Sequence, residues 1–187
     1  MSYAGSGTNA LDRGIEAVVY AHRAMSTVAP AALWERRFGS ATIRLQKRYR
    51  LVPRGVAACF TCATFPTWNA FPAMLASLAT GNAVIVKPHP TGILPMALSV
   101  RAARRVLAAA GFDPNLVTLA VDSPAEPLGK RLVEHPLTAI VDFTGSARFG
   151  AWVERHAHPA LCYTETSGVN TVLLESVHDL DAVARSL

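Results

Sequence analysis

Short apolar runs alternate with longer amphipathic stretches over most of the chain. Four runs rich in apolar and β-branched residues are typical of strands buried on both faces, and they cover residues 56–62, 83–86, 116–121 and 138–143. The stretches that follow them predict helices over residues 69–79, 93–110, 124–134 and 146–157. Because strands alternate with helices, the pattern predicts an α/β fold with a doubly wound parallel sheet.

The first part of the chain departs from this alternation. Residues 10–29 have the apolar spacing of a helix, which Pro30 interrupts, and residues 41–51 alternate as an extended segment or hairpin arm. We therefore interpret residues 1–52 as a helical and extended segment that packs on the core, and residues 53–187 as the main domain.

The last part of the chain predicts structure that it does not complete. Two short runs, residues 161–164 and 170–174, are predicted as strands, and residues 179–187 begin a helical pattern. The chain stops before that helix reaches an ordinary length. We therefore expect a C-terminally truncated piece of a larger domain.

Composition predicts a folded protein in a reducing compartment. Hydrophobic residues make up 51% of the 187 residues, which is ample for a core. No apolar run approaches about 18 residues, so no membrane span is predicted, and the first residues lack the basic and apolar regions of a signal peptide. Three cysteines, an odd number, suit the cytoplasm, which is the expected location.

The formal net charge of +5 raises the question of a nucleic-acid partner. The basic excess is concentrated between Arg36 and Arg54, a stretch without the aromatic pattern of an RNA-binding sheet, a zinc motif or a helix-turn-helix motif. We interpret it as a solvated face, or alternatively as a surface that attracts an anionic substrate or cofactor. No nucleic-acid partner is predicted.

Residues 66–88 are the centre of the chain's organisation. They are interpreted as a loop, a buried helix, a tight turn at Gly81-Asn82 and a buried strand that ends at Lys87. In open α/β sheets, ligands bind at the carboxyl ends of the strands. Lys87 is therefore a candidate ligand-binding residue, although a lysine in this position can also simply reach solvent.

Four motifs in this part of the chain carry a resemblance to a known family. They are Thr67-Trp68-Asn69-Ala70-Phe71-Pro72, the strand ending in Lys87-Pro88, the turn Phe143-Thr144-Gly145-Ser146, and Glu165. In this order they resemble the Pro-Trp-Asn-Phe-Pro, Lys-Pro, Phe-Thr-Gly-Ser and Glu-Leu-Gly-Gly motifs of the aldehyde dehydrogenase superfamily. The resemblance covers residues 53–187 and implies a partial Rossmann-like NAD(P)-binding domain. The residues around these motifs are most similar to the PaaN type of aldehyde dehydrogenase, which acts in phenylacetic acid degradation.

The resemblance implies a set of cofactor-binding residues, namely Trp68, Lys87, Phe143, Gly145 and Ser146. Lys87 corresponds to the lysine that binds the adenosine ribose. The turn before Ser146 opens a helix, whose N-terminal N–H groups could hold the pyrophosphate. Taken alone, Ser146 is equally explained as an ordinary helix N-cap.

The resemblance also suggests which nicotinamide cofactor is used. Members that prefer NAD usually carry a glutamate for the ribose hydroxyls where this chain has Pro90. A carboxylate there would repel a 2′-phosphate, so its absence predicts NADP rather than NAD.

Two residues match the catalytic positions of the family. Asn69 corresponds to the asparagine that stabilises the oxyanion, although an asparagine before a helix can also be a cap. Glu165 corresponds to the general base, and its neighbours Leu161, Cys162 and Tyr163 predict a poorly solvated carboxylate, although it can also be an exposed turn glutamate. Thr166-Ser167-Gly168 departs from the family's Leu-Gly-Gly.

The family's nucleophilic cysteine lies further beyond the glutamate than this chain extends. The cysteines present are Cys59, Cys62 and Cys162, and Cys59 with Cys62 forms a Cys-x-x-Cys pair without a second pair or a helix N-terminus. We interpret all three as buried small apolar residues. Histidine spacing predicts no metal site.

Together these features predict that the intact protein oxidises an aldehyde to an acid through a thioester. The resemblance implies NADP, an aldehyde substrate linked to coenzyme A, and a homo-oligomer. The chain alone should be inactive, since it lacks the nucleophile. Two alternatives are an acyl-CoA reductase of the same superfamily, which Glu165 disfavours, and a non-catalytic nucleotide-binding remnant.

Overall fold

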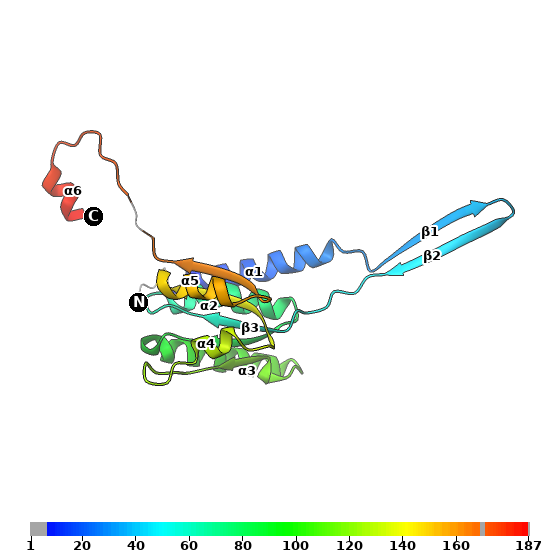
Figure 1. Ribbon diagram of the computed structural model, residues 1–187, viewed down its shortest axis with the longest axis horizontal. Coiled ribbons are helices and arrows are strands. Elements are labelled where there is room, and N and C mark those ends of the chain that lie inside the picture. The colour runs from blue at the N-terminus through cyan, green and yellow to red at the C-terminus, as the bar shows by residue number, and fades with distance from the viewer. Residues whose placement is uncertain (1–6, 169–170, 187) are drawn as a thin grey trace.

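A five-stranded parallel sheet forms the centre of the protein, as seen in the computed structural model (Figure 1), which describes residues 7–168 and 171–186. The strands lie side by side in the order β5-β4-β3-β6-β7. Their bounds are β3 Val56–Phe60, β4 Ala83–Lys87, β5 Val117–Leu119, β6 Thr138–Gly145 and β7 Leu161–Thr166. The predicted α/β fold with a parallel sheet is therefore confirmed.

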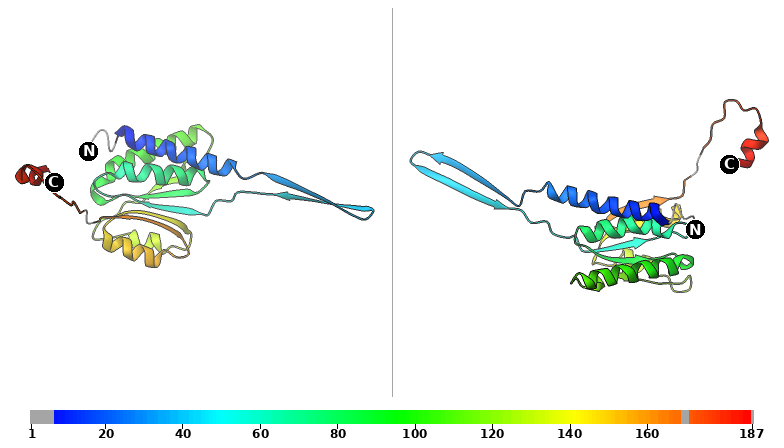
Figure 2. Two further views of the ribbon diagram at one scale, coloured as in Figure 1. Left: turned by 90° about the horizontal axis from the view of Figure 1, so that it is seen from above. Right: turned by 180° about the vertical axis from the view of Figure 1, so that it is seen from behind.

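Helices cover both faces of this sheet (Figure 2). One face carries α2 and α3, and α1 packs on α2; the other face carries α4 and α5. The bounds are α1 Asn9–Ser26, α2 Pro66–Ala79, α3 Ile93–Ala109, α4 Gly129–Val133 and α5 Ala147–His156. The windings reverse between β3 and β6, which is the doubly wound arrangement.

The central strands β3 and β6 contribute alternate residues to two separate cores. On the α2 and α3 face, Cys59 and Val86 pack with Met96, while on the α4 and α5 face Phe60 and Val141 pack among their own neighbours. Because both faces of β3 are buried, that strand has no polar side, which explains its continuous apolar run. The helix predicted over residues 93–110 is confirmed as α3, whose buried face carries Met96 and Val100.

The buried side-chain amide of Asn82, just before β4, binds the backbone just before β3. The Asn82 side chain is 4% exposed, and its Oδ1 accepts hydrogen bonds from Arg54 N at 2.7 Å and Gly55 N at 3.1 Å. Its Nδ2 donates to Thr80 Oγ1 at 2.9 Å. Gly81, at φ +86°, supplies the left-handed conformation of the turn. The turn was predicted, but this role of Asn82 was not.

The N-terminal segment forms a helix and a projecting hairpin. Helix α1 confirms the helix predicted over residues 10–29, and β2 Ala41–Arg48 confirms the extended segment. Its partner β1 Ala31–Phe38, antiparallel to β2, was not predicted. Every residue of both strands is exposed, and the hairpin extends well away from the sheet (Figure 1).

Three predicted elements differ from the structure. The motif before residue 72 is not a loop, because Pro66 occupies the first turn of α2, a favourable helix position for proline. The helix predicted over residues 124–134 shortens to α4, since Asp122 Oδ2 accepts from Leu128 N at 3.0 Å and holds the preceding segment as a loop.

The end of the chain is the third difference. Residues 171–174 form no strand, and Asn170 lies outside the described residues. Helix α6, Leu180–Ser186, agrees with the helical pattern predicted near the end, whose last residue is also outside the described part. Among the described residues, no helix combines the length and apolar character needed to cross a membrane.

Candidate functional site

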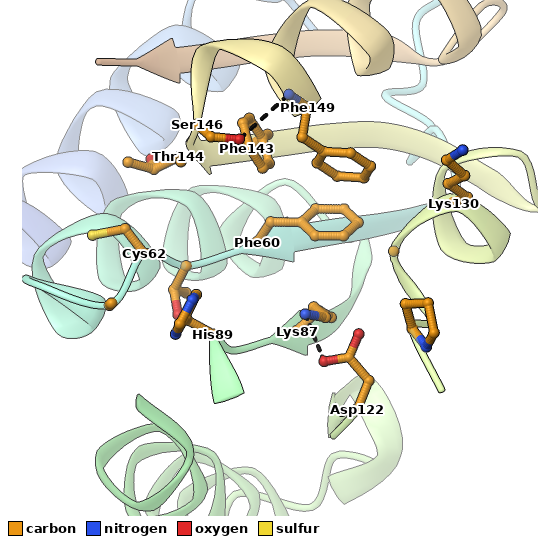
Figure 3. Close-up of a pocket in the computed structure, with 15 residues that line it drawn as sticks. Phe60, Cys62, Lys87, His89, Asp122, Lys130, Phe143, Thr144, Ser146 and Phe149 are labelled. Carbon is orange, nitrogen blue, oxygen red and sulfur yellow. Dashed lines mark hydrogen bonds and ion pairs between the residues drawn. The ribbon is translucent and has the colours of Figure 1, made fainter. Parts of the chain in front are cut away.

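The reversal of strand order opens a cavity beside the carboxyl ends of β3, β4 and β6. The chain leaves β3 towards α2 on one face and leaves β6 towards α5 on the other, so no connection covers the gap between these strand ends. The cavity has a volume of about 530 Å³ (Figure 3). Four predicted cofactor residues, Lys87, Phe143, Gly145 and Ser146, line it.

The turn at the end of β6 presents a helix N-terminus to this cavity. Ser146 caps α5, since its Oγ accepts from Phe149 N at 3.4 Å, and the residue itself remains exposed. At Gly145 a side chain would clash, because a Cβ there would lie 2.7 Å from the Phe143 ring. Ser146 is thus an ordinary N-cap, and the same turn leaves the positive N-terminal end of α5 accessible to an anion.

Lys87 lies at the other side of the cavity, in a buried ion pair. Its Nζ is 2.6 Å from Asp122 Oδ1, and the two side chains are 14% and 4% exposed. The ammonium therefore points into the cavity wall and does not extend into bulk solvent (Figure 3). Asp122 was missed by sequence reasoning, although it directly follows a predicted strand next to that of Lys87.

The remaining walls suit a ligand with both flat and polar parts. Phe60, Phe143 and Phe149 pack edge to face, with ring centroids 5.3–6.4 Å apart, and form an apolar side. Thr61 is 4% exposed, and its Oγ1 has no hydrogen-bond partner among the described residues. An unpaired buried hydroxyl at a cavity wall is costly unless a ligand supplies the missing bond. These residues fit a dinucleotide.

A second cavity, of about 320 Å³, adjoins the first and contains the predicted catalytic pair. Asn69 Nδ2 lies 3.4 Å from Glu165 Oε2, and Thr144 Oγ1 donates to the same oxygen at 3.2 Å. Phe143 and Thr144 line both cavities. The amide comes from the first turn of α2 and the carboxylate from β7, so the fold brings together residues 96 positions apart.

Two expectations about these residues are corrected. Glu165 is exposed, not poorly solvated, because its strand lies at the edge of the sheet with only β6 beside it. Trp68 lines the second cavity and not the one that holds Lys87, and the Arg13 guanidinium lies 5.8 Å from its ring centroid. The helical geometry of residues 66–69 turns Trp68 towards α1.

Asp142 is a functional candidate that the sequence did not reveal. It lines the second cavity from β6, where it pairs with Cys59 of β3 on one side and Tyr163 of β7 on the other. Burial, and secondarily the charge of Glu165, raises the pKa of Asp142 to about 6. A carboxyl group that titrates near neutrality next to a candidate general base marks this cleft as chemically unusual.

The three cysteines have different environments. Cys59 is 1% exposed, and burial, with the charge of Asp142, raises the pKa of its thiol well above the usual value. Cys62 and Cys162 are only half-buried, so the prediction of three buried residues is right for Cys59 alone. Cys62 also lies beyond the end of β3, because that strand ends at Phe60. Within the described ranges, no group of three histidines, cysteines or carboxylates could hold a metal ion.

The sequence and fold are similar to those of known proteins. The family model described as Aldehyde dehydrogenase family matches residues 5–187. The chain belongs to the aldehyde dehydrogenase family. A solved NAD-dependent aldehyde dehydrogenase from Burkholderia multivorans is 49% identical, with a TM-score of 0.85 over 89% of this chain and 30% of that one.

Other relatives of this aldehyde dehydrogenase chain are more distant. The 1-pyrroline-5-carboxylate dehydrogenase 2 of Halalkalibacterium halodurans is 31% identical over 75% of this chain and 28% of its own length. A benzaldehyde dehydrogenase of Bacillus subtilis is 31% identical over 58% of the chain and 21% of its own. The chain thus spans about three tenths of the Halalkalibacterium halodurans and Burkholderia multivorans relatives.

The raised pKa of Asp142 predicts a pH-dependent stability in this aldehyde dehydrogenase chain. The folded state keeps this proton up to about pH 6, whereas the unfolded chain releases it near pH 4, so Asp142 lowers stability as the pH rises through that window. We expect Asp142→Asn to raise the free energy of unfolding at pH 8 by roughly 1–3 kcal/mol and to leave it nearly unchanged at pH 4.

Urea unfolding of both chains at pH 4 and pH 8 measures this difference. Asp12→Asn, at an exposed position in α1, controls for the loss of a carboxylate elsewhere. An Asp142→Asn chain that is equally or less stable at pH 8 would contradict the assignment.

Proposed function

We propose that the intact protein oxidises an aldehyde to a carboxylic acid through a thioester, with a nicotinamide cofactor held by this chain. One observation carries the proposal: Asn69 Nδ2 lies 3.4 Å from Glu165 Oε2, next to the cavity lined by Lys87 and Ser146. The family implies oxyanion stabilisation and water activation for these two groups, and both tasks need them at one reaction centre.

The roles of the chain's own groups follow from their atoms. The Asn69 amide N–H would donate to the oxygen that becomes negative when a thiolate adds to the aldehyde carbonyl. Glu165 would take a proton from the water that cleaves the thioester. Thr144 holds one Glu165 oxygen, which keeps the carboxylate oriented towards the amide. The cofactor, when bound, accepts the hydride; the thiol is expected from the rest of the intact protein.

The cavity would hold the cofactor along its length. The Ser146 turn would bind the pyrophosphate, the Lys87–Asp122 pair a ribose, and the phenylalanine wall an aromatic ring; all of these residues line one cavity. Solved relatives are described with NADP in Methanocaldococcus jannaschii and NAD⁺ in Pseudomonas syringae. These are 19% and 22% identical, so they support the fold and leave the choice of cofactor to this chain's residues.

We propose NADP as that cofactor. Pro90 places no carboxylate after β4, and the carboxylate that is present, Asp122, is neutralised by Lys87 at 2.6 Å. His89 is exposed at the cavity rim, where it could face a phosphate. The Burkholderia multivorans relative is described as NAD-dependent, which makes the choice a direct test of this charge argument.

We propose an aldehyde carried on coenzyme A, from phenylacetate breakdown, as the substrate. This assignment depends on the sequence Thr64-Phe65-Pro66-Thr67-Trp68-Asn69, which is similar to that of the PaaN type. The named relatives act, by their names, on pyrroline-5-carboxylate and benzaldehyde. Comparing these aldehydes with a coenzyme A-linked one separates the three substrate classes.

A homo-oligomer in the cytoplasm completes the proposal. The hairpin β1–β2 exposes large apolar side chains, namely Leu33, Trp34, Phe38, Ile43 and Leu45. Exposed apolar area of this kind marks contact surfaces, and a second copy is the partner that the family implies.

The catalytic roles predict distinct kinetic defects in the intact protein. We expect Asn69→Ala to lower kcat by about 10²–10³-fold, the usual effect of removing one oxyanion donor. Glu165→Gln should still release one equivalent of NADPH and then stop, because the thioester forms but is not hydrolysed. Absorbance at 340 nm measures both the burst and the steady state.

Two controls complete that experiment. Glu134→Gln, exposed at the end of α4, should match the unaltered enzyme. The 187-residue chain alone should show no turnover. Turnover by that chain, or full activity in Asn69→Ala, would contradict the proposal, whereas cofactor binding without any activity in the intact protein would favour the nucleotide-binding remnant.

The cofactor proposal predicts a higher kcat/KM with NADP than with NAD. Pro90→Glu should reverse this order, because a carboxylate there would accept from ribose hydroxyls and repel a 2′-phosphate. Pro90→Ala removes the ring without adding charge and should keep the NADP preference. Steady-state kinetics of the intact protein with each cofactor measure the ratio, and a preference for NAD before substitution would refute the proposal.

A further inference from the structure

Cys62, on the loop between β3 and α2, lines the first cavity and contacts Asn69 of the second. Its Sγ is 2.7 Å from Asn69 Oδ1 and 3.3 Å from Thr64 Oγ1, and it accepts a hydrogen bond from Phe65 N at 3.4 Å. The residue lines the cofactor cavity (Figure 3) and is half-buried. It is the one cysteine of the three in hydrogen-bond contact with a proposed catalytic side chain.

The direction of these hydrogen bonds follows from the chemistry of the groups. An ionised Glu165 carboxylate can only accept, so Asn69 must turn its Nδ2 towards it. The Asn69 Oδ1 then faces Cys62, and an amide oxygen can also only accept, so the thiol must be the donor. If the amide flipped, its oxygen would lie against the carboxylate, and the bond between Asn69 and Glu165 would be lost.

A continuous set of hydrogen bonds therefore connects four elements. The Cys62 thiol donates to Asn69, Asn69 donates to Glu165, and Thr144 donates to the same carboxylate. The loop after β3, helix α2 and strands β7 and β6 each contribute one member. Glu165 thus binds the nitrogen end of the Asn69 amide, and Cys62 binds its oxygen end.

We propose that Cys62 is a positioning residue that fixes the Asn69 amide with its N–H groups directed to the reaction centre. This inference rests on the proposed function, because it gives the amide its catalytic direction. It needs the thiol as a hydrogen-bond donor, not as a nucleophile. A serine at the same position could donate in the same way, whereas an alanine could not.

The kinetic test compares variants of the intact protein. We expect Cys62→Ala to lower kcat by about 10-fold or more, since misplacing a catalytic group can cost up to 10²-fold, while the KM for the cofactor changes little. Cys62→Ser should recover most of the lost kcat. Cys162→Ala is the matched control, because Cys162 is also half-buried but packs on the α5 face of the sheet.

Full kcat in Cys62→Ala, or an equal loss in the serine and alanine variants, would overturn the inference while leaving the proposed function in place. A serine variant with recovered kcat supports a donor role, which a merely space-filling residue would not show.

A second measurement does not depend on activity. In the 187-residue chain, Cys62 should be alkylated by iodoacetamide about 3- to 10-fold faster in Asn69→Ala, the scale of one lost hydrogen bond, with Cys162 as the internal reference. Peptide mass spectrometry gives both rates. An unchanged Cys62 rate would overturn the inference. A faster alkylation of Cys62 in Asn69→Ala, together with no dehydrogenase activity in the intact protein, would support the hydrogen bond and refute the proposed function alone.

Discussion

The pairing of β3 with β6 is the constraint on which both cavities depend. Phe60, the last residue of β3, lies opposite Phe143 in this parallel pair, so the loop after β3 lies beside the final residues of β6, which ends at Gly145. Beyond these ends the chain turns to α2 from one strand and to α5 from the other. The register therefore places Cys62 and Asn69 on one side of the gap and Thr144 and Ser146 on the other. A shift by one residue would reverse the faces of these side chains.

The fold could be predicted well where burial dictates the pattern. Strands with two covered faces are continuous apolar runs, and α3 shows one apolar stripe, so both were found from sequence alone. Prediction failed where local chemistry decided. The amide of Leu128 is held by Asp122 from six residues away, which shortens α4, and β1 exposes all of its side chains, so no burial pattern identified it.

The site was predictable only as far as the motifs extend. Asn69, Lys87, Ser146 and Glu165 lie in the two cavities as expected, because each belongs to a short recognisable run. Their partners could not be found in the same way. Asp122, Asp142 and Cys62 gain significance only from neighbours brought close by strand order and helix placement. The exposure of Glu165 was mispredicted because Leu161 and Tyr163, which share its face of β7, are themselves exposed at the edge of the sheet.

The central claim is that the gap between β3 and β6 binds a nicotinamide dinucleotide. Titration of the isotopically labelled 187-residue chain with NADP, followed by NMR of the backbone amides, tests it most directly. The account predicts saturable shifts at Thr61, Lys87, Gly145 and Ser146, with little change on the exposed side of α3. Shifts confined to the α3 arginines, or no saturable change at the cavity residues, would contradict it.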